Sequence, residues 1–172
     1  YGKEAMGLST TAIRELRTMA AAAVSGPANG KCTTTCIWAG LGENYDPVLK
    51  VTLDQINMWL DIAPEQDQVE MTRAWWMAKK RHYAAARPWQ IVKGPIGAMI
   101  ATLDFNGWNP ISPFKWIDTN GATWRLNNYQ ECRQDLHRAI REQLFRNIWM
   151  LAATHQDGAG LQDGPDLSVL RK

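Results

Sequence analysis

Hydrophobic residues recur at helical spacing in five stretches of the chain, and this pattern predicts a mainly α-helical protein. Apolar side chains three and four residues apart share one face of a helix, so each stretch would bury one side in a core. Hydroxyl or carboxylate side chains before several stretches, and Gly or Pro after them, are typical helix boundaries. The predicted helices cover approximately residues 9–24, 46–62, 65–86, 94–103 and 128–154.

One β-hairpin interrupts this helical pattern. Strand-like residues at 114–118 and 122–126 flank Asn120-Gly121, a dipeptide that favours a two-residue type I′ turn because both central residues take positive φ. Such a turn also fixes which side chains face each other across the two strands. The predicted pairs are Ile117 with Trp124 and Trp116 with Arg125, the latter with the cation over the ring.

Two glycine-rich stretches separate these elements. Residues 26–45 contain Gly, Pro and many polar side chains, and we predict a long irregular connection that Trp38 anchors. The sequence indicates a single helical domain over 1–154 with the hairpin 114–126 inserted, followed by a Gly-rich loop and C-terminal arm at 155–172. Because the chain lacks an initiator Met and ends where an apolar, basic pattern begins, we expect a longer parent polypeptide.

Tryptophan is unusually abundant, with nine residues against four Tyr and three Phe. A Trp side chain buries a large apolar area and also anchors protein interfaces, so we expect most to lie in the core and a few at a surface. Neighbouring helical residues point about 100° apart, so only one of Trp75 and Trp76 should face inward. The candidate protein-interface residues are Trp38, Trp75, Trp108 and Trp116.

Basic and aromatic residues alternate in the segment 73–93, although the whole chain carries a net charge of only +2. This composition is typical of surfaces that stack bases and neutralise phosphates. The alternative interpretation is that the aromatic side chains face the core and the charges face water. The candidate nucleic-acid-binding residues are Lys79, Lys80, Arg81, Arg87 and Lys93.

The sequence contains no recognisable catalytic, phosphate-loop or cofactor motif, so we expect neither enzyme activity nor a cofactor. Cys32 and Cys36 with Cys132 and His137 could supply four zinc ligands, but three residues separate the first two thiols where zinc knuckles have two, and we predict no metal site. An odd number of cysteines favours a reducing, intracellular compartment. No apolar run reaches the roughly 20 residues that span a bilayer.

Several segments of the chain resemble parts of one known protein family. Residues 1–9 (YGKEAMGLS) with 13–17 (IRELR) are similar to the stretch just after the polymerase domain in the reverse transcriptases of LINE-type, non-LTR retrotransposons. The resemblance to LINE-like reading frames of dinoflagellates is closer, and it covers most of the chain. It rests on 89–98 (WQIVKGPIGA), 107–110 (GWNP), 116–118 (WID) through Gly121, and 155–161 (HQDGAGL).

The resemblance implies a thumb or connector role, because that family's polymerase aspartates and cysteine-rich knuckle would lie outside this segment. Two hypotheses follow. In the first, a non-catalytic, retroelement-derived domain serves as a structural or linker subunit among the proteins of a larger assembly, an organellar one included. In the second, the segment contacts RNA or DNA within a reverse transcriptase. The near balance of 19 basic and 17 acidic residues favours the first.

Overall fold

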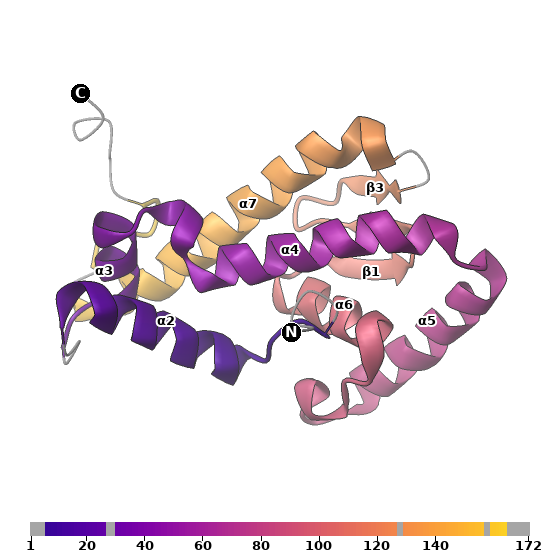
Figure 1. Cartoon of the computed structure of the whole chain (residues 1–172), viewed down its shortest axis with the longest axis horizontal. Coiled ribbons are helices and arrows are strands. Elements are labelled where there is room, and N and C mark those ends of the chain that lie inside the picture. Colours follow the sequence, from indigo (N-terminus) through magenta and orange to yellow (C-terminus); the bar gives the residue numbers. More distant parts are fainter. Residues whose placement is uncertain (1–5, 27–29, 127–128, 157–158, 165–172) are drawn as a thin grey trace. The chain divides into compact units, whose positions relative to one another are not determined.

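The computed structural model describes residues 6–26, 30–126, 129–156 and 159–164. Within these ranges the chain forms six α-helices and one three-stranded antiparallel sheet, so the predicted mainly α-helical fold class is confirmed. Figure 1 shows the elements, which are α2 (Thr10–Ser25), α3 (Thr33–Gly40), η1 (Glu43–Tyr45), α4 (Pro47–Ile62), η2 (Ala63–Glu65), α5 (Gln68–Ala84), η3 (Pro88–Ile91), α6 (Gly94–Phe105), β1 (Asn109–Ser112), β2 (Lys115–Ile117), β3 (Thr123–Arg125) and α7 (Tyr129–Ala153).

The contacts within the chain divide it into two compact units. The first unit comprises Tyr1–Thr10 and Val51–Ile140, and the second comprises Thr11–Lys50 and Arg141–Lys172. Two boundaries fall inside α4 and α7, and the third follows Thr10, the first residue of α2.

The expected single domain over residues 1–154, with a C-terminal arm at 155–172, stays a prediction. Part of the arm lies outside the described residues, namely 157–158 and 165–172. The same is true of residues 1–5, which open the segment that resembles LINE-type proteins.

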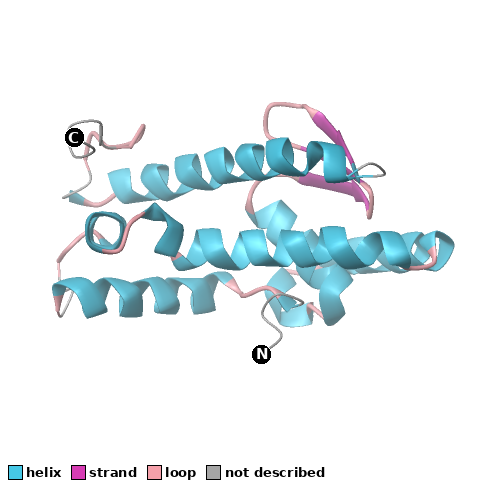
Figure 2. Ribbon diagram, turned by 45° about the horizontal axis from the view of Figure 1, so that its top comes forward, coloured by secondary structure: helices cyan, strands magenta, loops and turns pink. Residues whose placement is uncertain are grey.

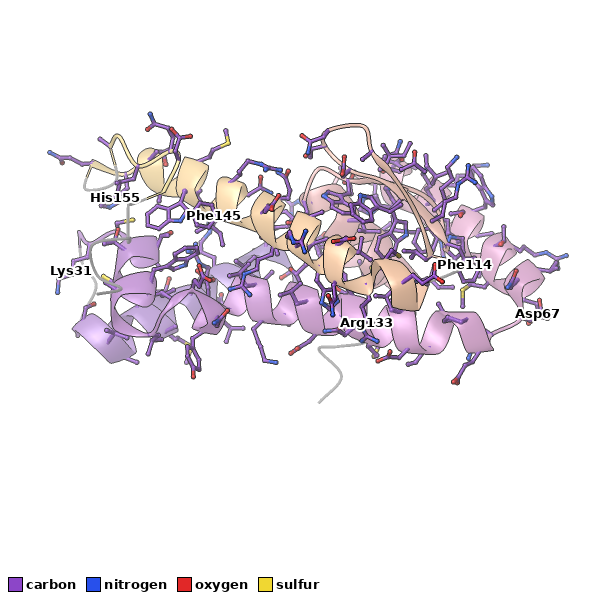
Figure 3. All side chains as sticks on the ribbon, turned by 90° about the horizontal axis from the view of Figure 1, so that it is seen from above. Lys31, Asp67, Phe114, Arg133, Phe145 and His155 are labelled. Carbon is purple, nitrogen blue, oxygen red and sulfur yellow. The ribbon has the colours of Figure 1, made fainter. Side chains whose placement is uncertain are left out.

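The five predicted helices are present, and four of them begin and end within about two residues of the expected positions. The third, α5, is shorter than the predicted range of 65–86. It begins after Asp67 because this carboxylate accepts hydrogen bonds from the N–H groups of Val69 at 2.8 Å and Glu70 at 2.9 Å. An N-terminal cap of this kind typically contributes about 1 kcal/mol to helix stability. Figure 3 labels Asp67 at this helix end.

The irregular connection predicted at 26–45 is wrong in part, because residues 33–40 form α3. Tertiary packing explains the difference, since both Ile37 and Trp38 are buried. The Trp38 ring packs edge to face against Phe145 and Trp149 of α7, with both ring centroids 5.1 Å away. Trp38 therefore anchors this segment as predicted, and burial of the anchor stabilises a helix that the local composition does not favour.

A buried ion pair lies at the start of α4 in the second unit. The Arg17 guanidinium of α2 donates to both carboxylate oxygens of Asp46, from Nε at 3.0 Å and 3.2 Å and from Nη2 at 3.0 Å, and Nη2 also donates to Thr34 Oγ1 at 2.8 Å. The same carboxylate accepts from Trp38 Nε1 at 3.2 Å and from the Val48 N–H at 3.1 Å. Asp46 therefore caps α4, as expected, and also joins α2, α3 and α4.

The core of the first unit is built around α6, which packs against α5 and β1 (Figure 1). Residues 98–103 of α6 are all buried, because this short helix is apolar around its whole circumference. Two polar contacts join elements inside this core. Thr102 Oγ1 donates to Gln55 Oε1 of α4 at 2.7 Å, and Trp59 Nε1 donates to the Pro113 carbonyl at 3.1 Å.

The predicted hairpin exists as β2 and β3, and β1 pairs with β2, so the strand order is β1-β2-β3. Figure 2 shows strands of this sheet in magenta. The expected register is wrong by one residue. Trp116 faces Trp124 rather than Arg125, and Ile117 faces Thr123. Arg125 faces Lys115 instead, so the predicted Trp116–Arg125 cation–π pair does not form.

The turn explains the change of register. Instead of a two-residue loop at Asn120-Gly121, the loop runs from Asp118 to Ala122, whose carbonyl accepts the Asp118 N–H at 3.0 Å. The Asp118 carboxylate also accepts the N–H groups of Asn120 at 2.8 Å and Ala122 at 2.9 Å. Among the described residues positive φ occurs only at glycines, here Gly121 at 82°, so the type I′ turn is not formed.

Helix α7 places most of its predicted apolar positions in the core. Leu136, Ile140, Leu144 and Ile148 are buried. Leu151 continues the same spacing but is 64% exposed, and the buried residue of this last turn is its neighbour Ala152.

Candidate nucleic-acid interface

All four tryptophans predicted to form a protein interface are buried within the chain itself. Trp75 and Trp116 have no exposed surface, and Trp38 and Trp108 are nearly as buried. The Trp75 Nε1–H group donates to the Pro110 carbonyl at 3.3 Å, and the Trp108 ring stacks on Trp124. The prediction is therefore corrected: these side chains build the core and offer no surface to a partner.

Two exposed aromatic side chains of the first unit lie instead on the outer face of α5. Trp76 is 56% exposed while its neighbour Trp75 is fully buried, so the prediction that only one of the two faces inward is confirmed. Tyr83 is 53% exposed, and because it lies two turns beyond Trp76 it points in nearly the same direction. Together with Met77, Lys79 and Lys80, these two rings line a shallow groove, which we call the α5 groove.

Lys79 occupies the space between the two exposed rings. Its ammonium nitrogen lies 5.7 Å from the centroid of the Trp76 ring and 5.8 Å from that of Tyr83, within the range of cation–π attraction. The same nitrogen is 3.4 Å from Asn109 Oδ1 on β1. Burial lowers the pKa of Lys79, and the nearby Asp104 carboxylate opposes this effect.

Asp104 of α6 holds the C-terminal end of the α5 groove in place. Its Oδ1 accepts a hydrogen bond from the Tyr83 hydroxyl at 3.1 Å, and its Oδ2 lies 3.0 Å from His82 Nε2. The imidazole of His82 is buried, and its ring packs edge to face on Tyr83 with 5.0 Å between centroids. Asp104 therefore fixes the Tyr83 ring from one side while leaving more than half of the residue open to solvent.

The Tyr83 hydroxyl should ionise at unusually high pH. Burial, the Asp104 charge and the hydrogen bond to Asp104 together raise the pKa of Tyr83 to about 12. Because folding raises the pKa of Tyr83, the protonated hydroxyl contributes to the stability of the folded state. This contribution is fully present below about pH 10, the ordinary pKa of tyrosine, and is lost as the pH rises through about 12. In an absorbance titration of tyrosine ionisation, the step that disappears in the Tyr83→Phe variant should lie near pH 12. Asp104→Asn should move this step to lower pH. A removed step near pH 10 would contradict this assignment.

The structure divides the predicted nucleic-acid residues into separate groups. Lys79 and Lys80 line the α5 groove, whereas Arg81 and Lys93 line a second small depression with His82 and Gly97. Arg87 precedes η3 as its N-cap residue and lines neither. Apart from the half-buried Lys79, the five predicted cations are exposed.

The segment that carries these cations is free of acidic residues. No Asp or Glu occurs between Glu70 and Asp104, whereas 73–93 contains six Lys or Arg. The other thirteen Lys and Arg of the chain are outnumbered by its seventeen Asp and Glu. The low net charge of the whole chain therefore conceals a strongly basic local surface.

The predicted nucleic-acid-binding residues do not include Trp76 and Tyr83, which define this surface, although both lie in the basic-aromatic segment 73–93. Their spacing of seven residues placed them on one helix face. Which face turned outward depended on the packing of α5 against α6. The position of Asp104 beside Tyr83 had no sequence signal, because 21 residues separate the two.

No group of three or more His, Cys, Asp or Glu residues that could hold a metal ion exists among the described residues. Among the described residues the three cysteines form no disulfide, and Cys32 is buried while Cys36 and Cys132 are partly exposed. Within the described ranges, no helix has the length and apolar character needed to cross a membrane. Comparison with protein-family models, curated proteins and solved structures found no match to the chain.

Proposed function

We propose that this chain is a non-catalytic, retroelement-derived connector that contacts nucleic acid, in the manner implied by its resemblance to the region after the polymerase domain of LINE-type reverse transcriptases. The observation that carries the proposal is the acid-free segment 73–93. Its six cations are exposed or half-buried, and exposed aromatic rings lie among them. Phosphates are attracted to such a surface, and bases stack on its rings.

Salt dependence of binding tests the electrostatic part of this proposal. We expect the chain to bind fluorescently labelled RNA or DNA, with an affinity that falls steeply as salt rises. Each cation that contacts a phosphate should contribute roughly 0.7–0.9 to the slope of log K against log salt. Replacing Arg81, Arg87 and Lys93 by Gln should therefore flatten the slope measured by fluorescence anisotropy.

A matched control uses exposed cations outside this segment, namely Arg14, Lys31 and Arg138, replaced by Gln in one triple variant. This variant removes the same total charge and should change the slope much less. Equal effects of the two triple variants, or no binding at low salt, would contradict the proposal.

A structural or linker subunit of a protein assembly is the second candidate function, and one observation favours it. The outer face of α5 exposes Val69 and Met77 beside Trp76, and large exposed apolar side chains are typical of protein interfaces. Isolation of the native particle under mild conditions distinguishes the two. A nuclease-resistant, stoichiometric protein assembly supports the subunit, and a nuclease-sensitive particle containing a polymerase domain in the same polypeptide supports the connector.

A further inference from the structure

The outer face of α5 carries an aromatic pair with a spacing suited to stacking on a chain of bases. Trp76 and Tyr83 are seven residues apart, so they lie about 10.5 Å apart along the helix axis and differ by about 20° in direction. Stacked nucleotides of one strand are about 3.4 Å apart, so the two rings span roughly three nucleotide steps. More than half of each residue's surface is open to solvent.

Cations flank this aromatic pair on both sides. Residues three and four positions apart are neighbours on a helix, so Lys79 and Lys80 lie on either side of the line that joins Trp76 to Tyr83. Arg73, which is exposed, precedes Trp76 by three residues and extends the positive charge toward the start of the helix. A polyanion running along α5 would therefore meet positive charge beside each ring.

Two carboxylates lie near the ends of this face. The two oxygens of the Asp104 carboxylate are hydrogen-bonded to Tyr83 and His82. This carboxylate therefore serves mainly to position the Tyr83 ring, rather than to present negative charge to a ligand. Glu70 belongs to the first turn of α5, six residues before Trp76, and its direction differs from that of Trp76 by about 120°. Neither carboxylate interrupts the line between the two rings.

The exposed rings of Trp76 and Tyr83 favour single-stranded over duplex nucleic acid as the ligand. Bases in a duplex are paired and stacked on each other, so exposed side-chain rings can stack only on bases that are unpaired. A duplex would use the cations of this face but would leave Trp76 and Tyr83 without partners. Both the cations and the exposed rings find partners in a single strand.

We infer that the α5 groove binds single-stranded nucleic acid, with bases stacked on Trp76 and Tyr83 and the Lys79 ammonium placed to contact the phosphates between them. This inference rests on the proposed nucleic-acid function and specifies its ligand. Lys79 would exchange its cation–π contacts with the two rings for contacts with phosphate. Asp104 is a positioning residue, because it orients the Tyr83 ring.

The test compares a labelled 20-nucleotide oligothymidine with a blunt 20-base-pair DNA duplex, using the full chain and fluorescence anisotropy at fixed salt. Stacking on one ring is worth roughly 5- to 150-fold in affinity, so Trp76→Ala should weaken single-strand binding by that factor and leave duplex binding nearly unchanged. Trp76→Phe should recover most of the loss. Asp104→Asn should weaken single-strand binding by a smaller factor.

Phe105→Ala is the matched control, because Phe105 is an exposed aromatic residue of the same unit that does not line the α5 groove. It should leave both affinities unchanged. Circular dichroism verifies that each variant is folded.

Outcomes that overturn the inference are distinct from those that overturn the proposed function. If Trp76→Ala has no effect, or weakens single-strand and duplex binding equally, the stacking site is rejected while a cation-dependent duplex-binding function stands. If neither probe binds at low salt, the proposed function itself fails. If Trp76→Ala leaves nucleic-acid binding unchanged but dissociates a complex of this chain with another protein, the α5 groove is a protein interface and the inference is rejected.

Discussion

Replacing Asp46 by Ala should lower the free energy of unfolding by about 3–5 kcal/mol, because it leaves the Arg17 guanidinium buried without its partner charge. Asp46 has no exposed surface, and it also accepts hydrogen bonds from Trp38 and from the first turn of α4. One substitution would therefore remove a buried ion pair, an indole partner and a helix cap. Urea denaturation followed by far-ultraviolet circular dichroism measures the effect.

Two further variants separate the buried charge from the other contacts. In the double variant Arg17→Met with Asp46→Leu, no unpaired charge remains, so it should be less destabilised than Asp46→Ala alone. Asp135→Asn removes a carboxylate that is mostly exposed and pairs with Arg138 only along the helix, so it should change stability by less than about 0.5 kcal/mol. A loss below about 1 kcal/mol for Asp46→Ala would show that the pair does not stabilise the fold.

Replacing Trp75 by Ala should lower the free energy of unfolding by about 3–5 kcal/mol through loss of buried apolar surface and the cavity that remains. The Trp75 ring is fully buried, its centroid lies 5.4 Å from that of Trp59, and its Nε1–H bonds the Pro110 carbonyl on β1. Truncation would thus weaken the contacts of α5 with both α4 and the sheet. The denaturation midpoint in urea should fall accordingly.

The neighbouring residue provides an internal control. Trp76→Ala removes an identical side chain from the same helix, yet Trp76 is 56% exposed, so the expected change in stability is within about 0.5 kcal/mol. Similar losses for the two variants would mean that the burial assigned to Trp75 is wrong. The same Trp76 variant is the one expected to lose single-strand binding, so stability and binding should separate cleanly between these two positions.

The spacing of apolar residues was sufficient to predict the helices, because each long amphipathic stretch has a local period and local caps. The prediction failed where distant contacts decided the outcome. Helix α3 forms because Trp38 packs on α7, more than 100 residues away in the chain. The hairpin register follows the Asp118 side chain, which accepts two turn N–H groups and replaces the turn expected from Asn120-Gly121.

In the candidate site, too, some features follow from the local sequence and others from contacts with distant residues. The sequence was enough to identify the basic-aromatic segment and to predict that Trp75 and Trp76 point in different directions. It could not identify which ring faced outward. That outcome depends on tertiary packing, since α5 packs against α6 and β1 and its buried side carries Met71, Trp75 and Ala78. For the same reason the predicted interface tryptophans, chosen by residue type, were found in the core.

By itself, the sequence determined the mainly α-helical class, the approximate helix boundaries and the location of positive charge, because these properties depend on residues near each other in the chain. The tertiary structure alone decided α3, the strand register, the burial of six of the nine tryptophans and the pairing of Tyr83 and His82 with Asp104. Each of these depends on side chains that the fold brings together from distant positions, and burial favours the arrangement with the best packing and paired polar groups.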